Sequence, residues 1–270
     1  MTSMRSSAQP RALSRAAAIL VAGAAIAFGG AWHRGAGAAV LQVSPVRVQF
    51  GAVQNAQSLQ VFNSGKDDLN AQVRIMRWTQ ENGADKLVPA SEIVASPAIM
   101  RVSPGQRQTV RIVRLHPSAT PREQSYRVLI DELPPKENPR GLGLKVLLRY
   151  SIPVFVDGTA TAAAGRIAPG PVKTDLSQLR ARVVRNAAGA TEFQVRNDGP
   201  QAARISGLVA TLPGGQAQTV EAGLVGYVLP GRQMGWRVKL PYPMPSGMTL
   251  KARFNDDVEA QNVPLDEADR

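Results

Sequence analysis

The chain has 270 residues, of which 32 are lysine or arginine and 20 are aspartate or glutamate, and it contains no cysteine. Neither disulfides nor thiolate chemistry can therefore contribute, and the fold must rest on apolar cores, which a chain of this length can form. The net charge of +12 would suit anionic partners, but the basic residues are scattered and aromatic residues make up only 5% of the chain, a pattern that disfavours nucleic-acid binding.

The first 38 residues have the pattern of a cleaved export signal. Three arginines precede an apolar run at residues 16–29, and Ala36-Gly37-Ala38 forms a small-residue cleavage pattern. A membrane anchor is the weaker interpretation, because the run is short for a membrane span and rich in alanine and glycine. We therefore expect a signal peptide at 1–38 and a mature chain that works outside the cytoplasm. That mature chain has 28 basic and 20 acidic residues, a net charge of +8.

Region 39–157 consists of short alternating segments separated by turn residues at intervals of about 10 residues. Its first segment, 41–50, contains Pro45, which cannot donate to a sheet and is expected at an edge or a bend. The further expected strands are 59–62, 71–78, 99–102, 108–114, 125–133 and the stretch that begins at Gly141. Seven strands without a helical period predict an immunoglobulin-like sandwich.

Residues 141–156 form the stretch around which the chain is organised. Read with a period of two, it has an apolar row and a row that contains two basic residues. The apolar row is Leu142, Leu144, Val146 and Leu148, continued by Tyr150 and Ile152. The other row is Gly143, Lys145, Leu147, Arg149 and Ser151. This pattern predicts a long edge strand.

A second, smaller all-β domain is expected at 171–265. It follows a linker at 158–170 that is rich in alanine, glycine and threonine. Its expected strands are 179–184, 192–196, 203–208, 225–229, 236–240 and 249–254. The polar end of the chain is expected to be loosely held after Val263, with 266–270 as a tail.

Several motifs, in order, resemble the PapD-like periplasmic pilus-assembly chaperones. They are SPVR (44–47), VFNSG (61–65), SPGQ (103–106), QTVR (108–111), REQSYR (122–127) and DELPP (131–135). In the second domain, GYVLPG (226–231) with Trp236 resembles the archaic, spore-coat-protein-U-type branch of this family. The resemblance implies an all-β fold of two immunoglobulin-like β-sandwich domains in an L-shaped arrangement.

The resemblance also implies a function. Such chaperones bind, fold and cap pilin subunits in the periplasm by lending them a strand, and deliver them to an outer-membrane usher. The lent residues would be Leu142, Leu144, Val146 and Leu148.

Two basic residues of the family hold the C-terminal carboxylate of the pilin. The residue of the first strand corresponds to Arg47. On the seventh strand two alignments stay open, because counting along the strand selects Lys145, whereas aligning on Tyr150 and Pro153 selects Arg149.

The sequence offers little material for catalysis. His116 is the single histidine after residue 38, and neither a nucleophile elbow, a phosphate loop nor a metal-spaced cluster is present. Asp131 and Glu132 are neighbours on a strand and so face opposite sides. We expect no enzyme, no cofactor, no metal and no small-molecule substrate. A secreted two-domain structural or adhesive pilus component is the alternative, and self-association of the unloaded chain stays open.

Overall fold

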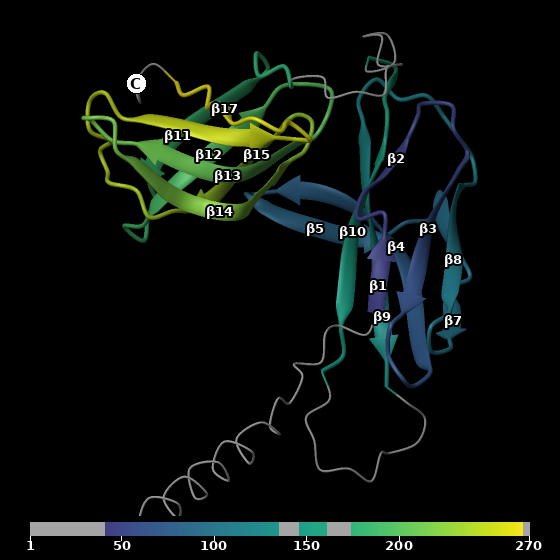
Figure 1. Ribbon diagram of the computed structural model, residues 1–270. Helices are drawn as coiled ribbons and strands as arrows, with labels where there is room; N and C mark the ends of the chain where they lie inside the picture. Colours follow the sequence, from purple (N-terminus) through teal and green to yellow (C-terminus); the bar gives the residue numbers. More distant parts are fainter. Residues whose placement is uncertain (1–40, 135–145, 161–173, 267–270) are drawn as a thin grey trace, which may run out of the picture. The chain divides into compact units, whose positions relative to one another are not determined.

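The computed structural model describes residues 41–134, 146–160 and 174–266, and residues 41–270 form one compact unit. Its described elements are 17 β-strands (Figure 1). Within these ranges no helix is long and apolar enough to cross a membrane. The strands form two sandwiches, each of two sheets, which confirms the all-β, two-domain immunoglobulin-like prediction.

The first sandwich contains ten strands where seven were expected, because the segment 41–50 forms two strands and residues 84–89 and 93–96 form two more. One sheet has the order β1-β3-β8-β6, and the other has the order β2-β10-β9-β4-β5, with β7 also paired to β4. The strands are β1 (Leu41–Ser44), β2 (Val48–Phe50), β3 (Ala56–Asn63), β4 (Leu69–Glu81), β5 (Ala84–Pro89), β6 (Ile93–Ser96), β7 (Ile99–Val102), β8 (Arg107–Arg114), β9 (Gln124–Leu133) and β10 (Arg149–Val156).

The chain changes sheets at Pro45, where a bend was expected. β1 pairs with β3 in one sheet, and β2 then pairs in parallel with β10 in the other. The Ser44–Pro45 peptide between them is cis. This crossing places Arg47 immediately before β2, at the level of β10.

β4 changes its buried face along its length. In its first half Leu69, Val73 and Ile75 point into the core of the first sandwich. Beyond Ile75 the buried residues are Trp78 and Gln80, each 2% exposed, and both contact residues of the second sandwich. The first half of β4 therefore contributes to the core of the first sandwich, and its second half contacts the second sandwich.

The second sandwich contains seven strands. Its sheets have the orders β11-β12-β15 and β14-β13-β16-β17. The strands are β11 (Leu179–Arg185), β12 (Thr191–Asn197), β13 (Ala203–Thr211), β14 (Ala217–Val228), β15 (Arg232–Arg237), β16 (Thr249–Phe254) and β17 (Gln261–Asn262). Leu265 is 6% exposed and bridges to Ala181, so the prediction that the chain is loosely held after Val263 is wrong for this residue.

The two sandwiches use the same device to close a turn. Asn63 and Asn197 each end a strand and are almost completely buried. Each amide nitrogen donates to two backbone carbonyls, and each amide oxygen accepts the N–H of a glycine two residues later. Buried amide groups that are fully bonded in this way fix the loop against the opposite strand. The sequence showed these sites only as turns.

An apolar cluster joins the sandwiches. Trp78 and Phe155 of the first pack with Leu229 of the second, and all three are at most 4% exposed. Tyr227 meets Trp78 edge-on, with ring centroids 5.4 Å apart. The guanidinium of Arg127 stacks 3.7 Å from the Trp78 ring centroid.

Hydrogen bonds complete this junction. The amide of Gln80 donates to the Tyr227 carbonyl at 2.9 Å and accepts from the Leu229 N–H at 2.8 Å. A second contact is made by Glu123, whose N–H donates to the Pro200 carbonyl and whose carboxylate accepts from the Ala202 N–H, both at 2.9 Å.

Candidate functional site

One side of β10 is an unpaired edge over most of its described length. β10 pairs with β9 along all eight residues, from Arg149 to Val156, and the two strands lie side by side (Figure 1). On its other side, β2 reaches only Val154–Val156. Among the described residues, 149–153 therefore have no strand partner on that side. Such an edge presents backbone groups that another chain can pair with.

The two rows expected on this stretch are present on β10. Ile152 is 4% exposed and Tyr150 packs partly against the same core, whereas Arg149 and Ser151 are exposed. The Tyr150 hydroxyl donates to the Leu41 carbonyl of β1. Tyr150 and Ile152 therefore lie on the inward face of the strand, as the predicted apolar row requires.

The described donor residues before β10 become more exposed with distance from the strand. Leu148 is half-buried, and its carbonyl accepts the Glu132 N–H at 3.0 Å. Val146 is 64% exposed, which is unusual for an aliphatic side chain next to a core strand. The strand itself begins at Arg149, later than expected. Leu142, Leu144 and Lys145 lie outside the described residues.

Arg149 is held by a carboxylate of the neighbouring strand. It contacts Asp131, which also accepts a hydrogen bond from Arg74 at 2.6 Å. Burial opposes ionisation of Asp131, but the hydrogen bonds from the two arginines outweigh it and hold the pKa of this carboxyl below its usual range. This small network keeps Arg149 on the outward face of the sheet.

Arg47 is held by groups from both sandwiches. Its Nη1 is 3.0 Å from Asp256 Oδ2, and its Nη2 donates to Gln49 at 3.0 Å. The guanidinium also lies 5.2 Å from the centroid of the Phe155 ring, a favourable cation–π distance. Its Nε is buried and finds no hydrogen-bond partner among the residues that the structure describes.

Of the three expected anchor residues, the two that the structure describes, Arg47 and Arg149, hold different carboxylates. The parallel register of β2 and β10 places Arg47 level with Pro153. Arg149 lies four residues earlier, about 13 Å along a strand. Asp256, which sequence reasoning missed, is 209 residues from Arg47 and shares no motif with it.

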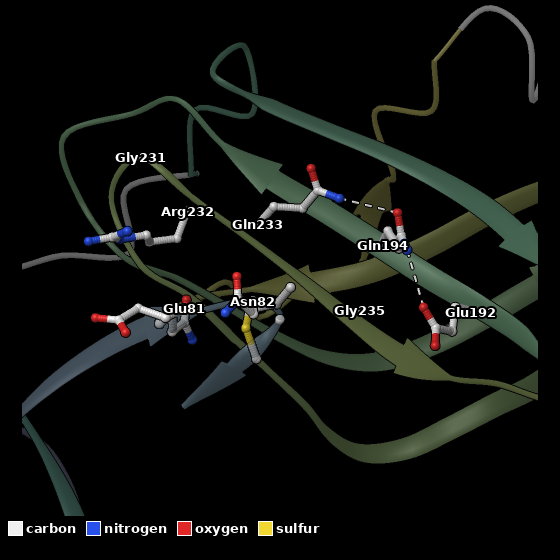
Figure 2. Close-up of a pocket in the computed structure, with 11 residues that line it drawn as sticks. Glu81, Asn82, Glu192, Gln194, Gly231, Arg232, Gln233 and Gly235 are labelled. Carbon is white, nitrogen blue, oxygen red and sulfur yellow. Dashed lines mark hydrogen bonds between the residues drawn. The ribbon is translucent and has the colours of Figure 1, made fainter. Parts of the chain in front are cut away.

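A polar cavity of about 670 Å³ lies elsewhere, between the turn that joins β4 to β5 and the strands β12 and β15. Figure 2 shows its chain of hydrogen bonds, from Gln233 to Gln194 and from Gln194 to Glu192. None of the expected site residues lines it. Within the described ranges, no group of three His, Cys, Asp or Glu side chains could hold a metal ion.

Comparison with known proteins gives one family-model match and several solved structures of similar fold. A family model described as "Pili and flagellar-assembly chaperone, PapD N-terminal domain" matches residues 40–161. One similar solved structure is the CsuC-CsuE chaperone-tip adhesion subunit pre-assembly complex from archaic chaperone-usher Csu pili of Acinetobacter baumannii. The match has a TM-score of 0.61 and 24% identity, and covers 84% of this chain and 98% of that one.

Two further solved structures share the fold. The YadV chaperone matches with a TM-score of 0.58 and 17% identity, covering 83% of this chain and 98% of that one. The complex of the Salmonella enterica SafA pilin with the SafB chaperone matches with a TM-score of 0.55 and 17% identity, covering 82% and 93%. The comparison with curated proteins gives no match.

Proposed function

We propose that this chain, whose residues 40–161 match the PapD N-terminal domain model of pilus and flagellar assembly chaperones, binds pilin subunits in the periplasm. It holds each subunit by lending it the stretch that leads into β10, and passes it to an outer-membrane usher. The observation that carries this proposal is the unpaired edge at 149–153, preceded by the exposed Val146.

The stretch can supply both affinity and register. Leu142, Leu144, Val146 and Leu148 would fill alternate pockets of the subunit while the backbones pair. Burying one such side chain contributes about 1.5–3 kcal/mol, so the four contribute about 6–12 kcal/mol before the costs of ordering. A basic pair, Arg47 with Arg149 or Lys145, would bind the C-terminal carboxylate of the subunit and so fix the register. Since Arg47 and Arg149 now hold different carboxylates, both side chains would have to turn toward the bound terminus.

The test is co-expression with a pilin from the same genome, followed by recovery of the complex on a tagged chaperone. Val146→Asp should lower the recovered subunit at least about tenfold, because it places a charge where an apolar side chain is buried. Folding should be unaffected, since Val146 is already exposed.

Leu147→Asp is the matched control, because Leu147 is its neighbour, is 42% exposed and belongs to the opposite row. Equal loss with both variants would contradict the donor row. A double variant, Arg47→Ala with Arg149→Ala, tests the anchor: unchanged recovery would rule out a role for these two arginines.

A further inference from the structure

Two arginines, one from each sandwich, flank a single carboxylate. Asp256 Oδ2 is 3.0 Å from Arg47 Nη1, and Asp256 Oδ1 is 3.5 Å from Arg204 Nη2. The side chain of Asp256 is 76% exposed, whereas those of Arg47 and Arg204 are 29% and 35% exposed. The positive half of this site is thus partly buried, and its negative half is open to solvent.

Both arginines are positioned by groups other than Asp256. Arg204 Nε donates to the Asn255 carbonyl at 3.0 Å, and the Arg204 N–H donates to the Asn255 side chain at 3.0 Å. Arg47 is held by Gln49 and by the face of the Phe155 ring. Losing Asp256 would therefore leave two cations preset for a carboxylate, the anion that guanidinium groups bind best in pairs of hydrogen bonds.

The turn that carries Asp256 is fixed on both sides of it. Asn255 has a left-handed backbone, with φ of 50°, and its N–H donates to the Arg204 carbonyl at 2.8 Å. Asp257 accepts from the Thr174 N–H at 3.1 Å. The neighbours of Asp256 are thus anchored. Its own side chain is 76% exposed and, among the described ion pairs, meets only the two arginines.

We propose that Arg204 is a carboxylate-binding residue, that it forms a clamp with Arg47, and that Asp256 is an internal stand-in which a bound carboxylate displaces. The chemical class of the ligand is the free carboxylate at the end of a polypeptide. That this polypeptide is a pilin subunit rests on the proposed function. The anchor on Arg47 then draws its second cation from the other sandwich, in addition to any basic residue of the strand.

The clamp can be tested without a subunit. The probe is N-acetylglycine, a minimal chain terminus, and its uncharged match is N-acetylglycinamide. Binding is followed by NMR on the Nε–H signals of Arg47 and Arg204. Asp256→Ala should bind N-acetylglycine about two- to fivefold more tightly than the wild type, the range expected from removing one competing exposed ion pair. Glu259→Ala, which removes an equal charge nearby, should leave the affinity unchanged.

A second substitution identifies the role of Arg204. In the Asp256→Ala background, Arg204→Gln should weaken N-acetylglycine binding about fivefold while it keeps a donor for the Asn255 carbonyl. Arg182→Gln, an exposed arginine of the same sandwich, should not change it. Binding by Asp256→Ala that is no tighter than wild type, or unaffected by Arg204→Gln, would overturn the clamp. Asp256→Asn repeats the test if the alanine variant is unstable.

Recovery of co-expressed subunit separates the two proposals. If Arg204→Gln reduces recovery as well as N-acetylglycine binding, the ligand of the clamp is the subunit. If N-acetylglycine binds as expected but Arg204→Gln leaves recovery unchanged, the assignment of the ligand is overturned and the chaperone function stands. If even the wild type recovers no subunit, the chaperone function fails, and the NMR titration still decides the clamp.

Discussion

Replacing Glu123 by glutamine should stabilise the protein at pH 8 and leave its stability at pH 4–5 almost unchanged. Glu123 is 7% exposed and accepts a hydrogen bond from the Ala202 N–H of the second sandwich. Burial raises the pKa of this carboxyl from 4.5 to about 7, although the Ala202 N–H, Arg47 and Gln49 lower it, and Asp157 adds to the rise.

The sign follows from proton binding. Between pH 4.5 and about 7 the folded protein keeps a proton on Glu123 that the unfolded chain releases. The stabilising contribution of this proton is complete below pH 4.5 and is lost as the pH rises through about 7. A pKa gap of about 2.5 units corresponds to about 3 kcal/mol. Glutamine keeps the acceptor for Ala202 without the charge, so it avoids this loss.

The assay is urea denaturation of both proteins at pH 5, 6, 7 and 8. The free energy of unfolding of Glu123→Gln minus that of the wild type should rise across this series, by up to about 3 kcal/mol. Other titrating groups are common to both proteins and cancel in the difference. Glu259→Gln, at an exposed site, should give a flat difference. A flat difference for Glu123→Gln as well, or a loss of stability at pH 8, would refute the reasoning.

Two other substitutions probe the junction and the second sandwich. Gln80→Ala should lower the free energy of unfolding by about 2–4 kcal/mol, because it removes the partner of a buried N–H and of a partly buried carbonyl in the second sandwich. Gln60→Ala, at an exposed position, should be nearly neutral in the same urea titration. Gly226→Ala should cost about 1–3 kcal/mol, since its Cβ would lie 2.4 Å from the Trp236 ring. Gly223→Ala in the same strand would meet nothing closer than 3.6 Å, so an equal loss there would contradict the clash.

Alternation predicted most strands that bury one face, although it missed β6 and placed β15 at 236–240 instead of Arg232–Arg237. It failed where a strand buries neither face. β5 is exposed at all six positions and exists because the far end of β4 offers it a partner, so it had no apolar period to detect. β14 was expected only at 225–229, whereas it spans Ala217–Val228. Its first residues are mostly exposed on an edge strand, and its register slips against β13, which removes the period of two.

The candidate site could be predicted only where it lies on one strand. The two rows of β10 follow from the sequence because neighbouring residues alternate between faces. The carboxylate partners do not, because Asp256 meets Arg47 across 209 residues and stands in a polar turn that reads as surface. The face change in β4 was equally hidden, since Trp78 and Gln80 are buried by a different domain.

The arginines and the apolar row contribute to binding in different ways. Arg149 already holds Asp131, and Arg47 already holds Asp256. Exchanging one carboxylate for another at an arginine gains little free energy, because similar charge-assisted bonds are broken and formed. Burial of Val146 and its neighbours in a partner would have no such offset, since Val146 is exposed to begin with. The arginines would therefore set the register while the apolar row supplies the affinity. In the proposed transfer of a subunit, a competing strand that matched the apolar row could then displace the stretch while each arginine returned to a carboxylate of its own chain.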